Sequence, residues 1–145
     1  MSGGEDVHVL LGRRYGSKED VVRAIGQVML ASGAVSPRYV EGMLEKEARS
    51  TTWITDDVAL PHGTNEVKRE VLRDCMVLVQ MPEGVDWGAG RRVRLAIGFA
   101  GRGDDRHVHL LKVLAGVLQS TEELARLRET SDVSEAMRIL AAHAA

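Results

Sequence analysis

Five histidines and one cysteine are the side chains of this sequence best suited to nucleophilic or metal chemistry: His8, His62, His107, His109, His143 and Cys75. A neutral imidazole can serve as a nucleophile, a proton carrier or a metal ligand near neutral pH. One cysteine can form neither an internal disulfide nor a multi-cysteine zinc site, which favours a reducing compartment. The cytoplasm is therefore the expected location.

His62 has the most suggestive surroundings. It follows Pro61 and precedes Gly63, at the end of an apolar run that predicts a short strand. Proline fixes the backbone before the imidazole, and glycine allows a ligand or another backbone to approach closely. Loops at strand ends are common places for reactive groups on a rigid scaffold. The local pattern suits an ordinary turn histidine, a nucleophile or a metal ligand.

The other histidines and the cysteine give weaker signals. His107 and His109 stand at the expected start of a helix, where a spacing of two puts them on different faces; on a strand they would form a His-x-His metal pair. His8 near the start and His143 in the last helical turn are expected to be structural. Cys75 opens a buried strand, where a thiol usually acts as a small hydrophobe.

Helical patterns occupy the first third of the chain. Ser17 is the expected N-cap of a helix that ends at Gly33, and Ser36 with Pro37 begins a second helix. Residues 51–60 are rich in β-branched side chains and predict one or two short strands that lead into Pro61.

Strands and then helices follow. The apolar run 75–81 predicts a buried strand that ends at 82–84, and 93–100 predicts a neighbouring strand. After a Gly-Arg-Gly-Asp-Asp turn, residues 107–118 predict a helix. Ser120, Ser131 and Ser134 offer caps for one or two further helices up to Ala142. The expected fold is α/β: a mixed β-sheet flanked by α-helices, in a single domain over residues 1–145.

Composition excludes several classes of function. The 145 residues carry 19 Lys+Arg and 21 Asp+Glu, a net charge of −2, and only two Trp, two Tyr and one Phe, which opposes nucleic-acid binding. No signal-peptide pattern and no run of about 18 apolar residues is present, so we expect no membrane insertion. Walker and dinucleotide glycine motifs are absent.

The ordered set of motifs resembles a known family. Val58-Ala59-Leu60-Pro61-His62-Gly63-Thr64 resembles the active-site signature of the enzyme IIA domains of the bacterial phosphoenolpyruvate-dependent sugar phosphotransferase system (PTS), of the mannitol/fructose type. The similarity covers roughly residues 7–142. Its other parts are Ser17-Lys18-Glu19, Gly33, Tyr39, Met43-Leu44, the mannitol-like Pro82-Glu83-Gly84-Val85, and Leu95-Ala96-Ile97-Gly98 followed by His107.

The resemblance implies a phosphocarrier. His62 would accept a phosphoryl group on Nε2 from the phosphohistidine of HPr and pass it to a cysteine of an EIIB component, while a separate membrane EIIC component moves and phosphorylates a sugar or polyol of the mannitol or fructose class. His107, at a helix N-terminus, would steady the phosphoryl group. The Thr64 hydroxyl and the 63–65 backbone would donate hydrogen bonds. The resemblance implies neither a cofactor nor a metal.

Two departures from the family pattern bear on the site. Lys46-Glu47 stands where the family has Arg-Glu, and lysine lacks the bidentate guanidinium fork. Arg49, one helical turn later, is a candidate substitute. The segment 53–57 also lacks the family's loop glycine. Two other functions stay open: a regulatory module in which a phosphohistidine acts on a transporter or transcription regulator, and a small metal-dependent hydrolase that uses His62, His107 and His109.

Overall fold

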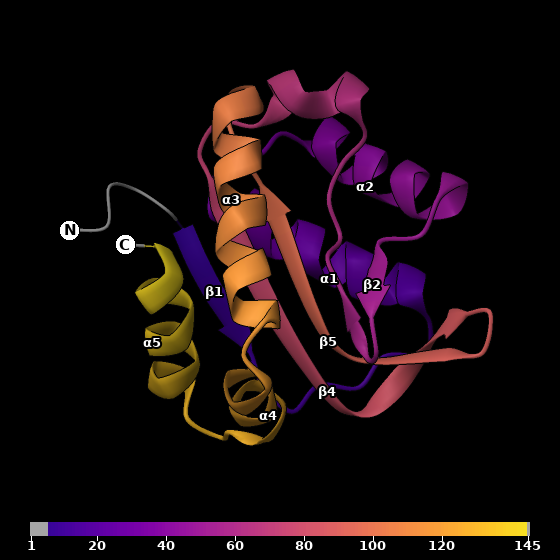
Figure 1. Ribbon diagram of the computed structural model, residues 1–145. Coiled ribbons are helices and arrows are strands. Elements are labelled where there is room, and N and C mark those ends of the chain that lie inside the picture. Colours follow the sequence, from indigo (N-terminus) through magenta and orange to yellow (C-terminus); the bar gives the residue numbers. More distant parts are fainter. Residues whose placement is uncertain (1–5, 145) are drawn as a thin grey trace.

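A mixed five-stranded sheet lies at the centre of the structure, a computed structural model that describes residues 6–144 (Figure 1). The sheet order is β1-β4-β5-β3-β2. Its strands are β1 (Asp6–Leu10), β2 (Trp53–Thr55), β3 (Val58–Ala59), β4 (Cys75–Gly88) and β5 (Arg91–Ala100). The pairs β1/β4 and β3/β5 are parallel, whereas β4/β5 and β2/β3 are antiparallel. The mixed sheet confirms the expected fold class.

Helices cover both faces of the sheet. On one side lie α1 (Lys18–Ala31) and α2 (Pro37–Arg49); on the other lie α3 (Gly103–Leu118), α4 (Thr121–Glu129) and α5 (Val133–Ala144), as Figure 1 shows. Strand β4 separates two apolar cores, because Cys75 and Val77 face α1 and α2 while Met76 and Leu78 face the other helices. Over residues 6–144, no helix combines the length and apolar character needed to cross a membrane.

The expected helix signals at the N-terminal end are confirmed. The Ser17 hydroxyl accepts a hydrogen bond from the Asp20 N–H at 3.1 Å and caps α1. Gly33 follows the helix with φ of +80°, and Ala34 N–H donates to the Met29 carbonyl at 3.0 Å. This is the left-handed ending that favours glycine. Pro37 begins α2 as predicted.

The strand boundaries differ from the prediction in two places. The sequence pattern gave no assignment for β1, whose five residues pair in parallel with β4. Strand β4 also continues past the predicted end at 82–84, up to Gly88. Its pairing with β5 is irregular between Gln80 and Val85, and Gly84 has φ of +75°. At such a bulge Pro82 need not donate a ladder hydrogen bond, so proline does not end the strand.

The segment 53–57 that lacks the family's glycine forms the β2–β3 hairpin. Asp56 takes φ of 45° at the turn, and the Trp53 indole N–H donates to the Asp56 carbonyl at 2.8 Å. The Arg128 guanidinium from α4 binds both oxygens of Asp57, at 2.7 to 3.0 Å. Asp56 thus supplies the left-handed turn residue, and Asp57 ties the hairpin to α4.

Helices α3 and α5 also begin at other residues than expected. Helix α3 starts at Gly103, so residues 103–105 of the predicted turn belong to the helix. The Asp74 carboxylate accepts hydrogen bonds from Arg102 N–H at 2.8 Å and from Arg106 Nε at 2.5 Å. Ser120 caps α4 as predicted. Helix α5 begins after Asp132, whose carboxylate accepts from Ser134 N–H at 2.9 Å, so neither Ser131 nor Ser134 is the cap.

Candidate functional site

An open cavity of about 200 Å³ lies where the end of α2, the loop after β3, the 3-10 helix η1 (Asn65–Glu70) and the start of α3 meet. The structure brings together in its lining all five site residues expected from the sequence: Lys46, Arg49, His62, Thr64 and His107. The lining is completed by Ser50, Gly63, Asn65 and Glu66.

One ring nitrogen of His62 is fixed by the backbone. Nδ1 lies 2.8 Å from the Leu60 carbonyl oxygen. A carbonyl can only accept a hydrogen bond, so Nδ1 carries the proton and Nε2 keeps its lone pair. Phe99 N–H donates to the Pro61 carbonyl at 3.0 Å and ties this loop to β5. His62 is therefore held with Nε2 as its nucleophilic atom.

Phe99 forms an apolar support beneath both histidines. Its ring centroid lies 4.9 Å from that of His62 and 5.2 Å from that of His107, and the two imidazole centroids are 5.7 Å apart. Burial lowers the pKa of His62, and the neighbouring His107 and Lys46 act in the same direction. Burial and Lys68 also lower the pKa of His107. Both rings are thus held in the neutral form near neutral pH.

Tyr39 positions the loop that carries His62. Its hydroxyl, on a side chain only 3% exposed, donates to the Phe99 carbonyl at 3.2 Å and accepts from Gly63 N–H at 3.0 Å. The Gly63 N–H is therefore not a free donor for a ligand, contrary to expectation. A Cβ on Gly63 would lie 2.8 Å from the Tyr39 ring, so glycine permits this approach. Burial raises the pKa of Tyr39 to about 12 and keeps the hydroxyl protonated.

His107 lies inside α3, not at its N-terminus as expected. It is the fifth residue of the helix, where a backbone N–H already bonds within the helix. His107 thus offers its imidazole to the cavity and not a free backbone N–H at the start of the helix. Gly101 allows this placement, because a Cβ there would lie 2.5 Å from the His107 backbone nitrogen.

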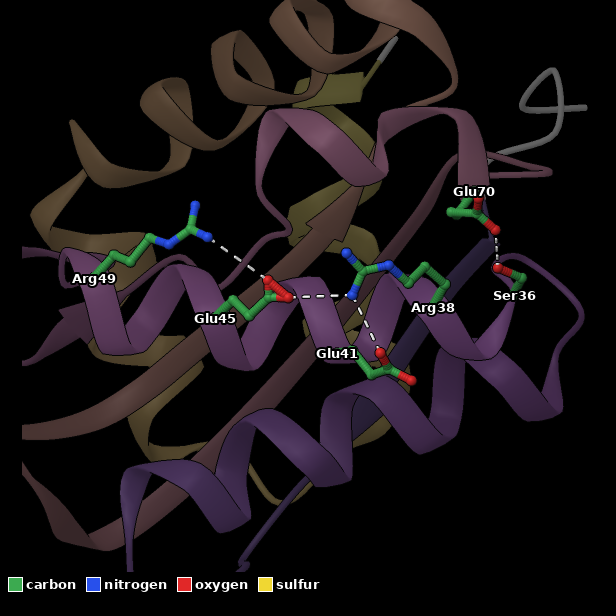
Figure 2. Close-up of polar contacts among 6 residues, drawn as sticks. All are labelled: Ser36, Arg38, Glu41, Glu45, Arg49 and Glu70. Atoms are coloured by element: carbon green, nitrogen blue, oxygen red, sulfur yellow. Dashed lines mark hydrogen bonds and ion pairs between the residues drawn. The ribbon is translucent and has the colours of Figure 1, made fainter.

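Two cations reach the cavity from the last turn of α2. Lys46 Nζ donates to the Ser50 hydroxyl at 3.1 Å. The Arg49 guanidinium lies 3.9 Å from Glu45 on its own helix and 3.5 Å from Glu66 of η1. Figure 2 shows Arg49 extending away from α2, with Glu45 between it and Arg38. Both cations are available for an anion bound in the cavity.

A buried carboxylate fixes this end of α2. Glu47 is 4% exposed and accepts from Thr52 N–H at 2.9 Å, from the Thr52 hydroxyl and from the Trp87 indole N–H at 3.1 Å. Three donors compensate the buried negative charge. Sequence reasoning did not identify Glu47, Tyr39 or Gly101 as positioning residues, since each acts on a partner in another element or loop, from Thr52 and His107 nearby to Gly63 and Trp87 farther along the chain.

Thr64 supplies an unused polar group. Its side chain is 7% exposed, and its hydroxyl oxygen has no hydrogen-bond partner within the described part of the chain. A buried hydroxyl without a partner is costly unless a ligand or water binds it. Because Thr64 lines the cavity, a bound anion is a suitable partner.

The remaining histidines lie apart from the cavity lining. His109 does not share it with His107, as the two-residue spacing predicts. His143 pairs with Glu123 at 2.5 Å and links α5 to α4. His8 lies on β1, where its Nε2 is 3.5 Å from Asp6.

Among the residues that the structure describes, Asp6, His8 and Cys75 form the group whose donor atoms could hold a metal, since these atoms lie within 4.8 Å of one another. Arg73 opposes this, because its guanidinium binds the Asp6 carboxylate at 2.8 Å. Burial also raises the pKa of the Cys75 thiol to about 12, whereas a metal ligand must be a thiolate. The cluster suits a neutral thiol better than a cation.

Comparisons with known proteins point to one family. The family model described as "Phosphoenolpyruvate-dependent sugar phosphotransferase system, EIIA 2" matches residues 5–143. The mannitol-specific enzyme IIA component of Bacillus subtilis is 33% identical over 120 residues, which cover 83% of each chain. The structure of a complex between the mannitol enzyme IIA and phosphorylated enzyme IIB of Escherichia coli is similar with a TM-score of 0.87, at 34% identity and with 93% and 94% of the two chains covered.

Some relatives are longer proteins. The mannitol-specific EIICBA component of Escherichia coli is 35% identical over 136 residues, which cover 92% of this chain and 21% of that protein. The chain spans between about a fifth and a third of the length of such multidomain relatives. Since the family model matches nearly all of the sequence, this chain belongs to the EIIA 2 family of the phosphoenolpyruvate-dependent sugar phosphotransferase system.

Proposed function

We propose that this chain is a cytoplasmic phosphocarrier of the mannitol class, with residues 1–145 forming one EIIA unit and His62 Nε2 accepting the phosphoryl group. The observation that carries the proposal is the Nδ1 contact with the Leu60 carbonyl, which leaves the lone pair on Nε2. HPr is the proposed donor and a cysteine of EIIB the proposed acceptor. A membrane EIIC component would couple the second transfer to uptake of mannitol or a related sugar.

The two transfers need no proton movement at His62. In the first, the Nε2 lone pair attacks phosphorus, the P–N bond of the donor phosphohistidine breaks, and its electron pair returns to the donor ring. The phosphorylated ring of His62 keeps the Nδ1 proton and carries positive charge, which the Leu60 carbonyl stabilises. In the second, a cysteine thiolate of EIIB attacks phosphorus and the P–Nε2 pair returns to His62. The Nδ1–H···O bond thus persists throughout.

The cavity supplies donors for the transferring group. Phosphoryl transfer depends mainly on in-line positioning and on charge stabilisation of the equatorial oxygens. Lys46 and Arg49 offer positive charge, the His107 ring a neutral N–H, and Thr64 its unpartnered hydroxyl. No metal is required for these steps.

Helix α3 also presents an apolar surface beside the site. Val108 and Leu111 are 47% and 37% exposed, on the turns next to His107. Exposed apolar side chains next to a reactive group suit a partner that docks and leaves. The net charge of −2 gives little long-range attraction, consistent with rapid release of two successive partners.

The proposal is tested by incubating the protein with phosphoenolpyruvate, enzyme I and HPr, followed by intact-mass measurement. Wild type should gain one phosphoryl group, and His62→Gln none. His107→Gln should gain it more slowly, while His109→Gln, which alters a histidine outside the cavity lining, should match wild type. Phosphorylation of His62→Gln would refute the assignment. Loading without transfer to EIIB would favour the regulatory alternative.

A further inference from the structure

A row of ion-paired side chains runs along the exposed side of α2 to the cavity. Arg38 Nη1 lies 3.1 Å from a carboxylate oxygen of both Glu41 and Glu45, and the other oxygen of Glu45 lies 3.9 Å from Arg49 (Figure 2). These residues are three or four positions apart, which places them along one helix face. The row ends at Arg49, which lines the cavity.

Arg49 has a second carboxylate partner across the rim. Its Nη1 lies 3.5 Å from Glu66, which comes from η1 and itself lines the cavity. The two side chains are 64% and 63% exposed. Ion pairs this exposed contribute little net stability, so the guanidinium can exchange Glu66 for a stronger partner at small cost.

A phosphoryl group on His62 would be that stronger partner. It carries more negative charge than a carboxylate and matches the bidentate guanidinium fork, which Lys46 lacks. It would also repel Glu66, the anionic side chain among the cavity-lining residues. Phosphorylation of His62 therefore favours contact of the Arg49 guanidinium with the phosphoryl oxygens and disfavours the Arg49–Glu66 ion pair.

Building on the proposed function, we infer that Glu66 is a positioning residue that holds Arg49 at the rim until His62 is phosphorylated and then yields it to the phosphoryl oxygens. Glu45, anchored by Arg38, keeps the guanidinium near the rim in both states. Release leaves Glu66 without its cation. The loaded and empty forms then present different charges to docking partners.

The test compares Glu66→Gln with Glu41→Gln, a matched control whose carboxylate pairs with Arg38 rather than with Arg49. Each protein is equilibrated with phosphorylated HPr, and the loaded fraction and the hydrolysis rate of the phosphohistidine are measured. Glu66→Gln should hydrolyse roughly two- to fivefold more slowly and load more fully, the range expected for an exposed ion pair. Glu41→Gln should match wild type. High salt should reduce the difference.

A second comparison separates the action of Glu66 through Arg49 from simple repulsion. In an Arg49→Gln background, Glu66→Gln should have a clearly smaller effect, because the cation it releases is gone and only the direct repulsion between Glu66 and the phosphoryl group remains. In wild type, the Arg49 guanidinium NMR signal should shift on phosphorylation. A Glu66→Gln effect that is equally large without Arg49, or no effect in wild type, would overturn the inference while leaving the phosphocarrier role intact. Failure of wild type to take up phosphate would overturn both.

Discussion

Replacing Tyr39 by phenylalanine removes the hydroxyl that joins β5 to the His62 loop. The buried Phe99 carbonyl then loses a donor and the half-buried Gly63 N–H loses its acceptor. Leaving such a buried group unpaired costs about 1–3 kcal/mol. A central value of about 2 kcal/mol corresponds to a melting temperature roughly 6–8 °C lower for a chain of this size. Because Gly63 adjoins His62, freeing this loop should also slow phosphoryl acceptance by roughly three- to tenfold.

The matched control is Tyr15→Phe. Tyr15 packs against the same apolar core, and its hydroxyl makes no hydrogen bond within residues 6–144. The effect on stability is measured by thermal unfolding and the effect on phosphoryl acceptance by single-turnover phosphorylation, each for Tyr39→Phe, Tyr15→Phe and wild type. Tyr15→Phe should resemble wild type in both assays. If Tyr39→Phe behaved like Tyr15→Phe, the assigned role of the Tyr39 hydroxyl would be refuted.

Three further predictions concern pH, charge and backbone space. Since burial lowers the pKa of His62, phosphoryl acceptance should reach its half-maximum below pH 6.5, and an inflection at or above 6.5 in the pH–rate profile would contradict this. The free energy of unfolding should also decrease as the pH drops below 6.5, because only the unfolded imidazole readily gains a proton. Lys46→Met should lower the transfer rate by roughly tenfold or more while Lys46→Arg keeps it, measured by rapid quench; equal rates in all three would exclude Lys46 from the phosphoryl site. Gly101→Ala should lower the free energy of unfolding in denaturant by about 1–3 kcal/mol and slow phosphoryl transfer, because its Cβ would meet the His107 backbone at 2.5 Å. The control is Gly16→Ala, where the nearest atom to a Cβ lies at 3.7 Å. Equal stability of the two variants would count against the assigned packing.

Local patterns were enough to predict much of the scaffold. Ser17, Gly33 and Pro37 have roles set by their neighbours within a few residues, and all three act as predicted. Two apolar runs were enough to predict that β4 and β5 are neighbours, and the structure shows that they pair antiparallel. The expected site residues followed from motif order, and the structure places all five in one cavity.

The errors arose where a partner distant in sequence sets the boundary. Asp74 fixes the start of α3 from 28 residues before Arg102, so the sequence of the 101–105 segment alone resembled a turn. Strand β4 passes Pro82 because a bulge against β5 removes the need for its N–H. The role of Tyr39 likewise depends on the backbone of Gly63, 24 positions away. Such contacts leave no periodic signal in the sequence.

The most direct test of the central claim is to identify the phosphorylated atom. Protein with ¹⁵N-labelled histidine, phosphorylated through HPr, would be examined by ¹⁵N and ³¹P NMR. Because Nδ1 of His62 donates to the Leu60 carbonyl, the phosphoryl group should be on Nε2, and Nδ1 should keep its proton. A phosphoryl group on Nδ1 of His62, or on any other residue, would contradict this account.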